Sequence, residues 1–289
     1  MKGSAHGTYA RLSHDPAIPI ECTGMTDLGY EIWGLSGPYE RYGGRWSRKV
    51  ASEFVDWLDV PPRRDWGDVG CGTGALVDAI LARFDPKALA AIDLSEGFIT
   101  ELRSRIHDPR VRFDVGDATS LPWPSASSDA TVAGLVLNFV SDPAAMVKEM
   151  ARVTRPGGKV AAYLWDYPRG MQMMQHFWDV AFKLDPNHSV LDRAERHPLS
   201  QPEPLGALFK AAGLKLVSVR IIEIPTVFRD FDDYWRPFLG KGGAAPTYLA
   251  SLDAKDRNRI RDALKARLVP GPKGSIAMTA RAWAVQGTV

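Results

Sequence analysis

The sequence predicts an α/β protein whose parallel sheet is covered by helices on both faces. Short apolar runs alternate with helical stretches between residues 65 and 166, and a glycine-rich turn joins the first such run to the helix after it. No internal repeat interrupts this alternation, which is the pattern of parallel strands connected by helices. The 289 residues, of which 45% are hydrophobic, are enough for one large or two modest domains.

The alternating region follows a helix that begins near Ser47 and is stopped by Pro61 and Pro62. A strand ending at Val69 opens the alternation. The elements expected after it are a helix at 75–84, a strand at 88–93, a helix at 95–106, strands at 111–117 and 129–137, a helix at 142–154 and a strand at 159–166. We expect Pro156, Gly157 and Gly158 to break the chain between the last helix and the last strand.

The pattern changes after Asp166, where helical stretches rich in Met, Phe and Trp lie outside the alternation. These stretches, at 167–186 and 228–240, predict a helical cap over the sheet. A helix at 202–213, which Gly213 is placed to stop, and strands at 214–224 and 275–287 then complete the sheet.

Four parts of the chain follow from these elements. They are an N-terminal arm at 1–38, a ligand-binding core at 39–166, a helical cap segment at 167–200, and a segment at 201–289 that completes the sheet and carries an inserted helical cap at about 229–270.

Charge gives no reason to expect a nucleic-acid partner. The 36 Lys and Arg residues against 34 Asp and Glu residues leave a net charge of +2, and the two signs are interspersed. The most basic stretch, 253–267, is interleaved with Asp253, Asp256 and Asp262. This spacing indicates a solvated, ion-paired helix face.

The two cysteines, Cys22 and Cys71, have no second thiol or histidine at metal-ligand spacing, so we expect reduced thiols and no metal site. The first residues lack the apolar segment of an export signal, and no window approaches the roughly 18 apolar residues of a membrane span. We therefore expect a cytoplasmic protein without a membrane partner.

The glycine turn is the first candidate site. Gly70, Gly72 and Gly74 lie between a strand end and a helix start, where backbone N–H groups can approach a ligand closely. Asp93 ends the next strand, close to the separation of roughly 20 residues at which an acid reaches a nucleotide ribose. The alternatives are a tight turn without a ligand, and an Asp93 that only caps the helix starting at Ser95.

Two ligands fit this turn, because "GCGTGA" also matches the fingerprint of dinucleotide-binding proteins. Asp68 distinguishes between a dinucleotide and a ligand with a methionine tail. A carboxylate there disfavours the pyrophosphate of the first and suits the ammonium of the second. Asp117, at the end of the third strand, can accept a hydrogen bond from an adenine amino group, and Ala118 leaves space for the ring. These residues favour S-adenosylmethionine (SAM) over NAD.

The stretches "DVGCGTG", "AIDLS", "VGDATSLPW", "SSDATVAGLVLNFVSDP" and "EMARVTRPGGKV", in this order, resemble the class I SAM-dependent methyltransferases. The resemblance covers residues 39–286 and is greatest to the small-molecule branch that includes quinone-biosynthesis C-methyltransferases. It implies a Rossmann-like, seven-stranded, mostly parallel sheet whose last strand is antiparallel. Trp66 and Gly67 depart from the branch, which has an aliphatic pair there, so we expect a distorted first strand.

The resemblance also implies the roles of the cofactor residues. The glycine turn contacts the methionine part, Asp93 holds the ribose and Asp117 meets the adenine. Tyr39 and Arg45 belong to a stretch similar to an element that closes over SAM in this branch, although an amphipathic arm packed on the sheet is the alternative. The cofactor candidates are Tyr39, Arg45, Asp68, Gly70, Gly72, Thr73, Gly74, Asp93, Leu94, Asp117, Ala118 and Leu135.

Methyl transfer needs mainly in-line alignment, and a general base only where the acceptor arrives protonated. Candidates for such a base are Asp166 and Tyr167, with His176, His188 and His197 in the cap, although a lone histidine there is more often a packing residue. The acceptor candidates are Asn138, Trp165, Met174 and Trp178, although a Met and aromatic stripe is more often core. We expect a methyltransferase for a small, partly apolar acceptor. The alternatives are an NAD-dependent oxidoreductase and a non-catalytic SAM-binding regulatory protein.

Overall fold

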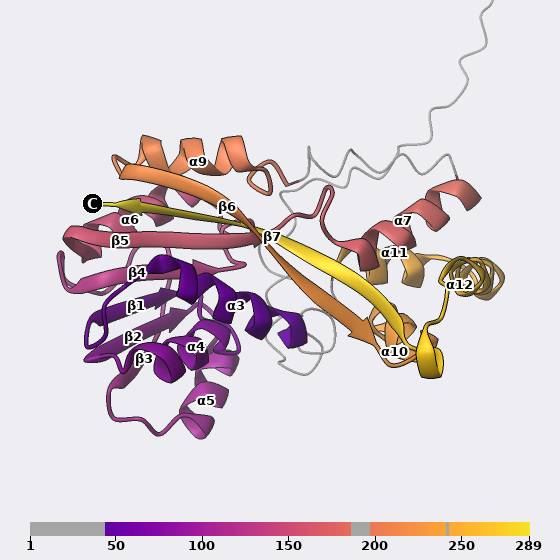
Figure 1. Cartoon of the computed structure of the whole chain (residues 1–289), viewed down its shortest axis with the longest axis horizontal. Coiled ribbons are helices and arrows are strands. Elements are labelled where there is room, and N and C mark those ends of the chain that lie inside the picture. The colour runs from indigo at the N-terminus through magenta and orange to yellow at the C-terminus, as the bar shows by residue number, and fades with distance from the viewer. Residues whose placement is uncertain (1–43, 186–196, 241–242) are drawn as a thin grey trace, which may run out of the picture.

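The computed structural model describes residues 44–185, 197–240 and 243–289. They form one seven-stranded sheet in the order β3-β2-β1-β4-β5-β7-β6 (Figure 1). Only β7 runs antiparallel to its neighbours, β5 and β6, which confirms the expected mostly parallel sheet with an antiparallel last strand. The strands are β1 (Asp65–Val69), β2 (Ala88–Asp93), β3 (Val111–Val115), β4 (Ser128–Gly134), β5 (Thr154–Trp165), β6 (Lys215–Phe228) and β7 (Ile276–Thr288).

Helices cover both faces of this sheet, and each face has its own apolar core. On one face lie α3 (Arg45–Leu58), α4 (Ala75–Phe84) and α5 (Glu96–Arg105), and on the other α6 (Pro143–Val153) and α9 (Pro202–Ala211). Helix α3 places Phe54 in the first core, and α9 places Phe209 in the second; both side chains are fully buried. The helices therefore hold the sheet as the strand–helix alternation predicts.

The first strand is regular, so the distortion expected from Trp66 and Gly67 does not occur. Strand β1 pairs in register with β2 from Asp65↔Ala88 to Val69↔Ile92. The Trp66 ring is buried 5.0 Å from that of Phe84. On the other face, a Cβ on Gly67 would lie only 2.9 Å from the ring of Trp123. The small residue thus makes room for Trp123 on one face of the strand, while Trp66 packs on the other, and the strand keeps its register.

Two further boundaries differ from the prediction. Strand β4 ends at Gly134, because Leu135 adopts a left-handed backbone with a φ of 62°. Strand β5 begins at Thr154, directly after α6, and passes through the Pro-Gly-Gly stretch that we expected to break the chain. Gly158 lies so close to β4 that a Cβ there would be 2.6 Å from the Asp129 carbonyl oxygen. The pairing of β4 with β5 shifts register here, from Ser128↔Thr154 to Ala130↔Lys159, so the Pro-Gly-Gly stretch forms a bulge within the strand and does not end it.

Strand β6 is longer than predicted, and it leaves the sheet together with β7 as a two-stranded ribbon (Figure 1). They stay paired from Lys215↔Thr288 to Phe228↔Ile276. The cap lies around the far end of this ribbon. Its helices are α7 (Gln172–Leu184), α10 (Phe231–Trp235), η3 (Arg236–Leu239), α11 (Ala244–Ser251) and α12 (Ala254–Arg267), and a short η4 (Pro272–Gly274) leads into β7.

The described ranges contain no helix with the length and apolar character needed to cross a membrane. Within the same ranges, no three side chains of His, Cys, Asp or Glu come together as metal ligands would.

Candidate functional site

The glycine turn lies at the carboxyl end of β1 and is fixed to its neighbour β2. The backbone N–H groups of Gly70 and Cys71 both donate to the carbonyl oxygen of Ile92, at 2.8 and 3.0 Å. Gly70 has a φ of 73°, and a Cβ on it would be 2.6 Å from the side chain of Val136. A Cβ on Gly72, in contrast, would have no atom within 4 Å. The turn is thus packed against the protein at its first glycine and open at its second.

Asp93 connects this turn to the next helix. One carboxylate oxygen accepts from the N–H of Gly72 at 2.8 Å, and the other accepts from the N–H of Ser95 at 2.8 Å. Burial raises the pKa of Asp93, and these hydrogen bonds partly offset the increase. The N-cap of α5 is Ser95, which accepts from Phe98 N–H, so Asp93 binds the backbone before the helix and is not itself the helix cap that we weighed as an alternative. Contact between Asp93 and a ribose stays a prediction.

Asp68 is a fully buried carboxylate with no hydrogen-bond partner in the described part of the chain. It is 0% exposed, and both of its carboxylate oxygens are unpaired. Burial raises its pKa to about 8, and the negative charge of Asp93 adds to the increase. A buried carboxylate is stable as an ion only beside a cation or hydrogen-bond donors. Asp68 therefore fits a cationic ligand group such as an ammonium, and does not fit a pyrophosphate.

Two apolar side chains stand exposed where β2 and β3 end. Leu94 is 50% exposed and Val115 is 47% exposed, and Val115 is paired with Asp93 across the two strands. Asp117 follows, and its Oδ1 accepts from the N–H of Thr119 at 2.7 Å and from its hydroxyl at 2.8 Å. Ala118 is half-buried beside it. A flat ring laid on Leu94 and Val115 would cover apolar surface next to a carboxylate, which suits adenine.

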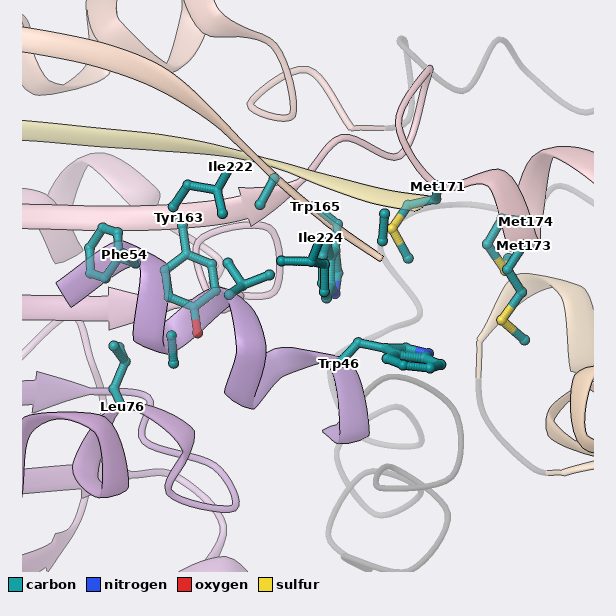
Figure 2. Close-up of a cluster of buried hydrophobic side chains, with 14 of the residues drawn as sticks. Trp46, Phe54, Leu76, Tyr163, Trp165, Met171, Met173, Met174, Ile222 and Ile224 are labelled. Carbon is teal, nitrogen blue, oxygen red and sulfur yellow. The ribbon is translucent and has the colours of Figure 1, made fainter. Parts of the chain in front are cut away.

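A second apolar region lies between the same edge of the sheet and the cap. Trp46 on α3 and Trp165 at the end of β5 are buried there (Figure 2). Met171, Met173 and Met174, from the start of α7, lie on the cap side of these two rings. Trp46 and Met173 were not among the predicted acceptor residues. Their signal in the sequence was the aromatic and Met content of "RWSR" and "MQMM".

Several predicted acceptor and base residues gather around one short segment, His197–Ser200. The side-chain amide of Asn138 donates to the Ser200 hydroxyl at 2.9 Å. The ring of Tyr167 lies 4.5 Å from that of His197. The ends of β4 and β5 are thus connected at the carboxyl edge of the sheet.

Asp166 and His176 are each engaged by other groups. Asp166 accepts from the N–H of Arg169 at 2.9 Å and lies 3.6 Å from the Arg281 guanidinium, while burial raises its pKa. His176 points toward α12, where its Nδ1 accepts from Arg267 Nε at 3.1 Å. Burial and the charge of Arg267 lower the pKa of His176, so the ring is a neutral acceptor. The structure therefore places Asp166 near the site and His176 on the far side of α7.

Trp178 and Arg45 also make contacts within the protein. The ring of Trp178 stacks on Phe182 at 5.4 Å and lies 5.5 Å from Tyr248. Arg45 donates to both carboxylate oxygens of Asp233 on α10, at 3.0 and 3.2 Å, and lies over the ring of Phe228. Arg45 thereby links the first helix of the core to the cap. Tyr39 and His188 lie outside the described residues.

Comparisons with known proteins identify the family to which this chain is similar. The family described as "Methyltransferase domain" matches residues 67–162, which include the end of β1, the glycine turn and Asp117. A demethylmenaquinone methyltransferase of Roseiflexus is 30% identical over 166 residues, which are 54% of this chain and 69% of that protein. A malonyl-[acyl-carrier protein] O-methyltransferase of Hahella chejuensis is 37% identical over 113 residues, or 39% of this chain and 40% of that protein.

A solved structure shares the fold. A phosphoethanolamine N-methyltransferase of Haemonchus contortus, in complex with S-adenosylhomocysteine, superposes with a TM-score of 0.52 at 15% identity, covering 87% of this chain and 56% of that one. The chain spans about half the length of several curated relatives that it matches. The fold, the glycine turn and these matches define the class, and the chain belongs to the class I SAM-dependent methyltransferases.

Proposed function

We propose that this protein binds SAM and transfers its methyl group to a small, partly apolar acceptor. The observation that carries the proposal is the buried, unpartnered carboxylate of Asp68 beside an open glycine turn. The ammonium of the methionine part would supply the missing cation, and it would do so without the charge conflict that a pyrophosphate would cause. SAM supplies a methyl group on a positively charged sulfur, which is already a good leaving group.

The chain's own residues would then bind and orient the cofactor. Asp93 would accept from the ribose hydroxyls, and Asp117 from the adenine amino group. Leu94 and Leu135 would contact the cofactor beside them, and Thr73 would lie next to the methionine part. Arg45 and Tyr39 stay proposed cofactor contacts, although Arg45 is already paired with Asp233.

The acceptor would lie between the carboxyl edge of the sheet and the start of α7. Trp165 and Met174 would contact its apolar part, and Asn138 would orient a polar group. We place Trp178 in the body of the cap, because it packs against Phe182 and Tyr248. This arrangement would exclude water from the sulfonium while it aligns the acceptor with the methyl group. Asp166 and Tyr167, which follow the end of β5, and His197, whose ring lies 4.5 Å from that of Tyr167, stay the proposed groups for receiving a proton.

The relatives support a small acceptor, because their names include demethylmenaquinone and trans-aconitate methyltransferases. A free, buried thiol at Cys71 supports the expectation that the protein works in a reducing compartment such as the cytoplasm.

Calorimetric titration with SAM, S-adenosylhomocysteine and NAD tests the proposal. We expect the two adenosyl compounds to bind and NAD to give no heat. Asp93→Ala should weaken both by about 1.5–3 kcal/mol, the usual contribution of hydrogen bonds to a charged group. Asp93→Asn, which keeps one acceptor oxygen for the turn, serves as the conservative control.

Binding of NAD without SAM would overturn the assignment. Unchanged SAM affinity in both Asp93 variants would remove only the ribose role of Asp93. Tight SAM binding without turnover across a panel of small acceptors would favour the regulatory alternative.

A further inference from the structure

The connection from β3 to β4 crosses the sheet without a helix. Strands β2 and β1 lie between β3 and β4 in the sheet, so residues 116–127 must pass over both. Parallel strands are usually joined by a helix, which satisfies its own backbone hydrogen bonds. Here the crossover has no regular structure, so its buried backbone groups need partners from elsewhere.

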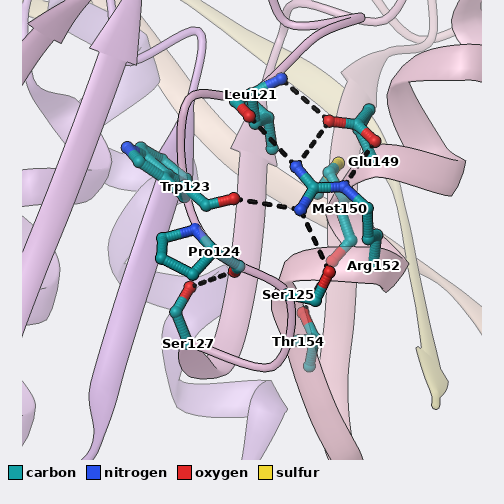
Figure 3. A network of polar contacts seen from close by, with 9 residues as sticks. All are labelled: Leu121, Trp123, Pro124, Ser125, Ser127, Glu149, Met150, Arg152 and Thr154. Carbon is teal, nitrogen blue, oxygen red and sulfur yellow. Dashed lines mark hydrogen bonds and ion pairs between the residues drawn. The ribbon is translucent and has the colours of Figure 1, made fainter.

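Two side chains of α6, Glu149 and Arg152, supply these partners (Figure 3). Glu149 Oε2 accepts from the N–H of Leu121 at 2.9 Å. Arg152 donates from Nη2 to the Leu121 carbonyl oxygen and from Nη1 to that of Trp123, each at 3.0 Å. A fourth bond, 3.3 Å long, reaches the hydroxyl of Ser125. Leu121 thus has both of its backbone groups bound by α6, as a neighbouring strand would bind them.

The two side chains also fix each other. Arg152 Nε donates to Glu149 Oε1, and Arg152 Nη2 donates to Glu149 Oε2, both at 2.7 Å. Such a bidentate pair has one planar geometry. Because the pair spans one helical turn, the position of α6 determines the position of the crossover.

This anchor lies close to the adenine side of the site. The N–H of Ser120 donates to the Asp117 carbonyl oxygen at 3.1 Å, so Asp117 to Ser120 form a single turn. Leu121, the residue bound by α6, follows that turn directly. A displacement of Leu121 would therefore move Asp117, whose exposed carboxylate makes its hydrogen bonds within its own turn, to Thr119.

We propose that Glu149 and Arg152 are positioning residues for the cofactor, because they hold the crossover where Asp117 meets the amino group of adenine. The proposal deepens the proposed function and rests on it. On this proposal, the site distinguishes adenine from a ring without that amino group only while the ion pair on α6 is intact.

The test compares two ligands that differ at this edge of the purine. S-adenosylhomocysteine carries the amino group, and S-inosylhomocysteine carries a carbonyl oxygen in its place and a hydrogen on the neighbouring N1. We expect the wild-type protein to prefer the first by about tenfold, the usual effect of one hydrogen bond. Arg152→Met should bring the two dissociation constants to within about twofold of each other, and Arg152→Lys, which keeps the charge and one donor group, should give an intermediate preference.

Arg155→Met is the matched control. Arg155 is 38% exposed, compared with 35% for Arg152, and it also pairs with carboxylates, Asp65 and Asp129 at 3.0 Å each. Those residues lie where β1 and β4 begin, at the opposite edge of the sheet from the glycine turn. Arg155→Met should therefore keep the wild-type preference, even if it lowers the thermal midpoint as much as Arg152→Met does.

Two results would overturn the proposal while leaving the proposed function intact. The first is an unchanged preference in both Arg152 variants. The second is an equal loss of preference in Arg155→Met, which would indicate general loosening. If Arg152→Met does not fold, Arg152→Lys decides. A wild-type protein that binds neither ligand would overturn the proposed function itself, and one that binds both equally would remove the role of Asp117 and this proposal with it.

Discussion

At the scale of single residues, Asp68 is the group of the candidate site whose burial is least favourable in free energy. A carboxyl group with no partner, buried at the centre of a sheet, is less stable ionised than protonated, and this is why its pKa rises to about 8. The titratable groups that face it are Asp93, on the neighbouring strand, and Cys71, in the glycine turn. Both groups become negatively charged when they ionise, so neither can stabilise the ionised form of Asp68.

This arrangement predicts a particular dependence of stability on pH. The unfolded chain loses the Asp68 proton near pH 3.8, and the folded protein retains it to about pH 8. Between these values the folded state binds more protons, so this group makes the free energy of unfolding fall as the pH rises, by about 1.4 kcal/mol per pH unit. The side chain in Asp68→Asn cannot ionise. The free energy of unfolding of this variant should therefore fall less steeply with pH than that of the wild type, by about 1.4 kcal/mol per pH unit.

Urea denaturation of both proteins at pH 5, 6, 7 and 8 measures this difference in slope. A constant offset from the buried amide does not affect the comparison. Parallel curves would mean that Asp68 ionises at an ordinary pKa. The same substitution should weaken SAM binding, because the ammonium loses its counter-charge.

The scale of elements shows which features the sequence reveals and which it does not. The glycine turn, the alternation of strands and helices and Asp93 were predictable, because each depends on spacing along one stretch of chain. Trp66 beside Gly67 was misjudged, because the partner that explains Gly67 is Trp123, brought across the sheet by folding. The Glu149–Arg152 pair was visible as an acid and a base at helical spacing, but its partners at Leu121 and Trp123 were not. What the prediction missed therefore consists of contacts between distant segments.

Helix α7 gives a prediction at this scale, because its buried residues have different surroundings. Trp178 is 4% exposed and packs between aromatic rings of the cap, so Trp178→Ala should lower the free energy of unfolding by about 3–5 kcal/mol. Met174→Ala should leave SAM affinity nearly unchanged and reduce turnover, since we place Met174 against the acceptor. Calorimetry, denaturation and a turnover assay corrected for the folded fraction separate the two effects. Unaltered turnover per folded molecule in Met174→Ala would assign that residue to the core as well.

At the scale of the whole molecule, the charge distribution predicts that the protein does not bind RNA or DNA. The basic helix α12 contains the ion pairs of Arg259 with Asp256 and of Arg261 with Asp262. A further pair joins Arg267 of this helix to Asp179 of α7. With a net charge of +2, the protein should show no salt-dependent affinity for RNA or DNA near the roughly micromolar range. Fluorescence anisotropy with labelled oligonucleotides over a range of salt concentrations measures this. Tight binding whose logarithm falls linearly with log salt would contradict it.

The ribbon of β6 and β7 has a consequence for how such a protein can be altered. Phe228 and Ile276 face each other as the last pair of the ribbon, so the chain between them leaves and returns at one point. The segment from α10 to η4 is therefore an insertion at the end of a hairpin. Its length does not affect the register in which β6 and β7 pair. The cap helices of this segment can therefore vary in length and sequence without changing the register of the strands that carry the glycine turn, provided that the pair of Arg45 and Asp233 is kept.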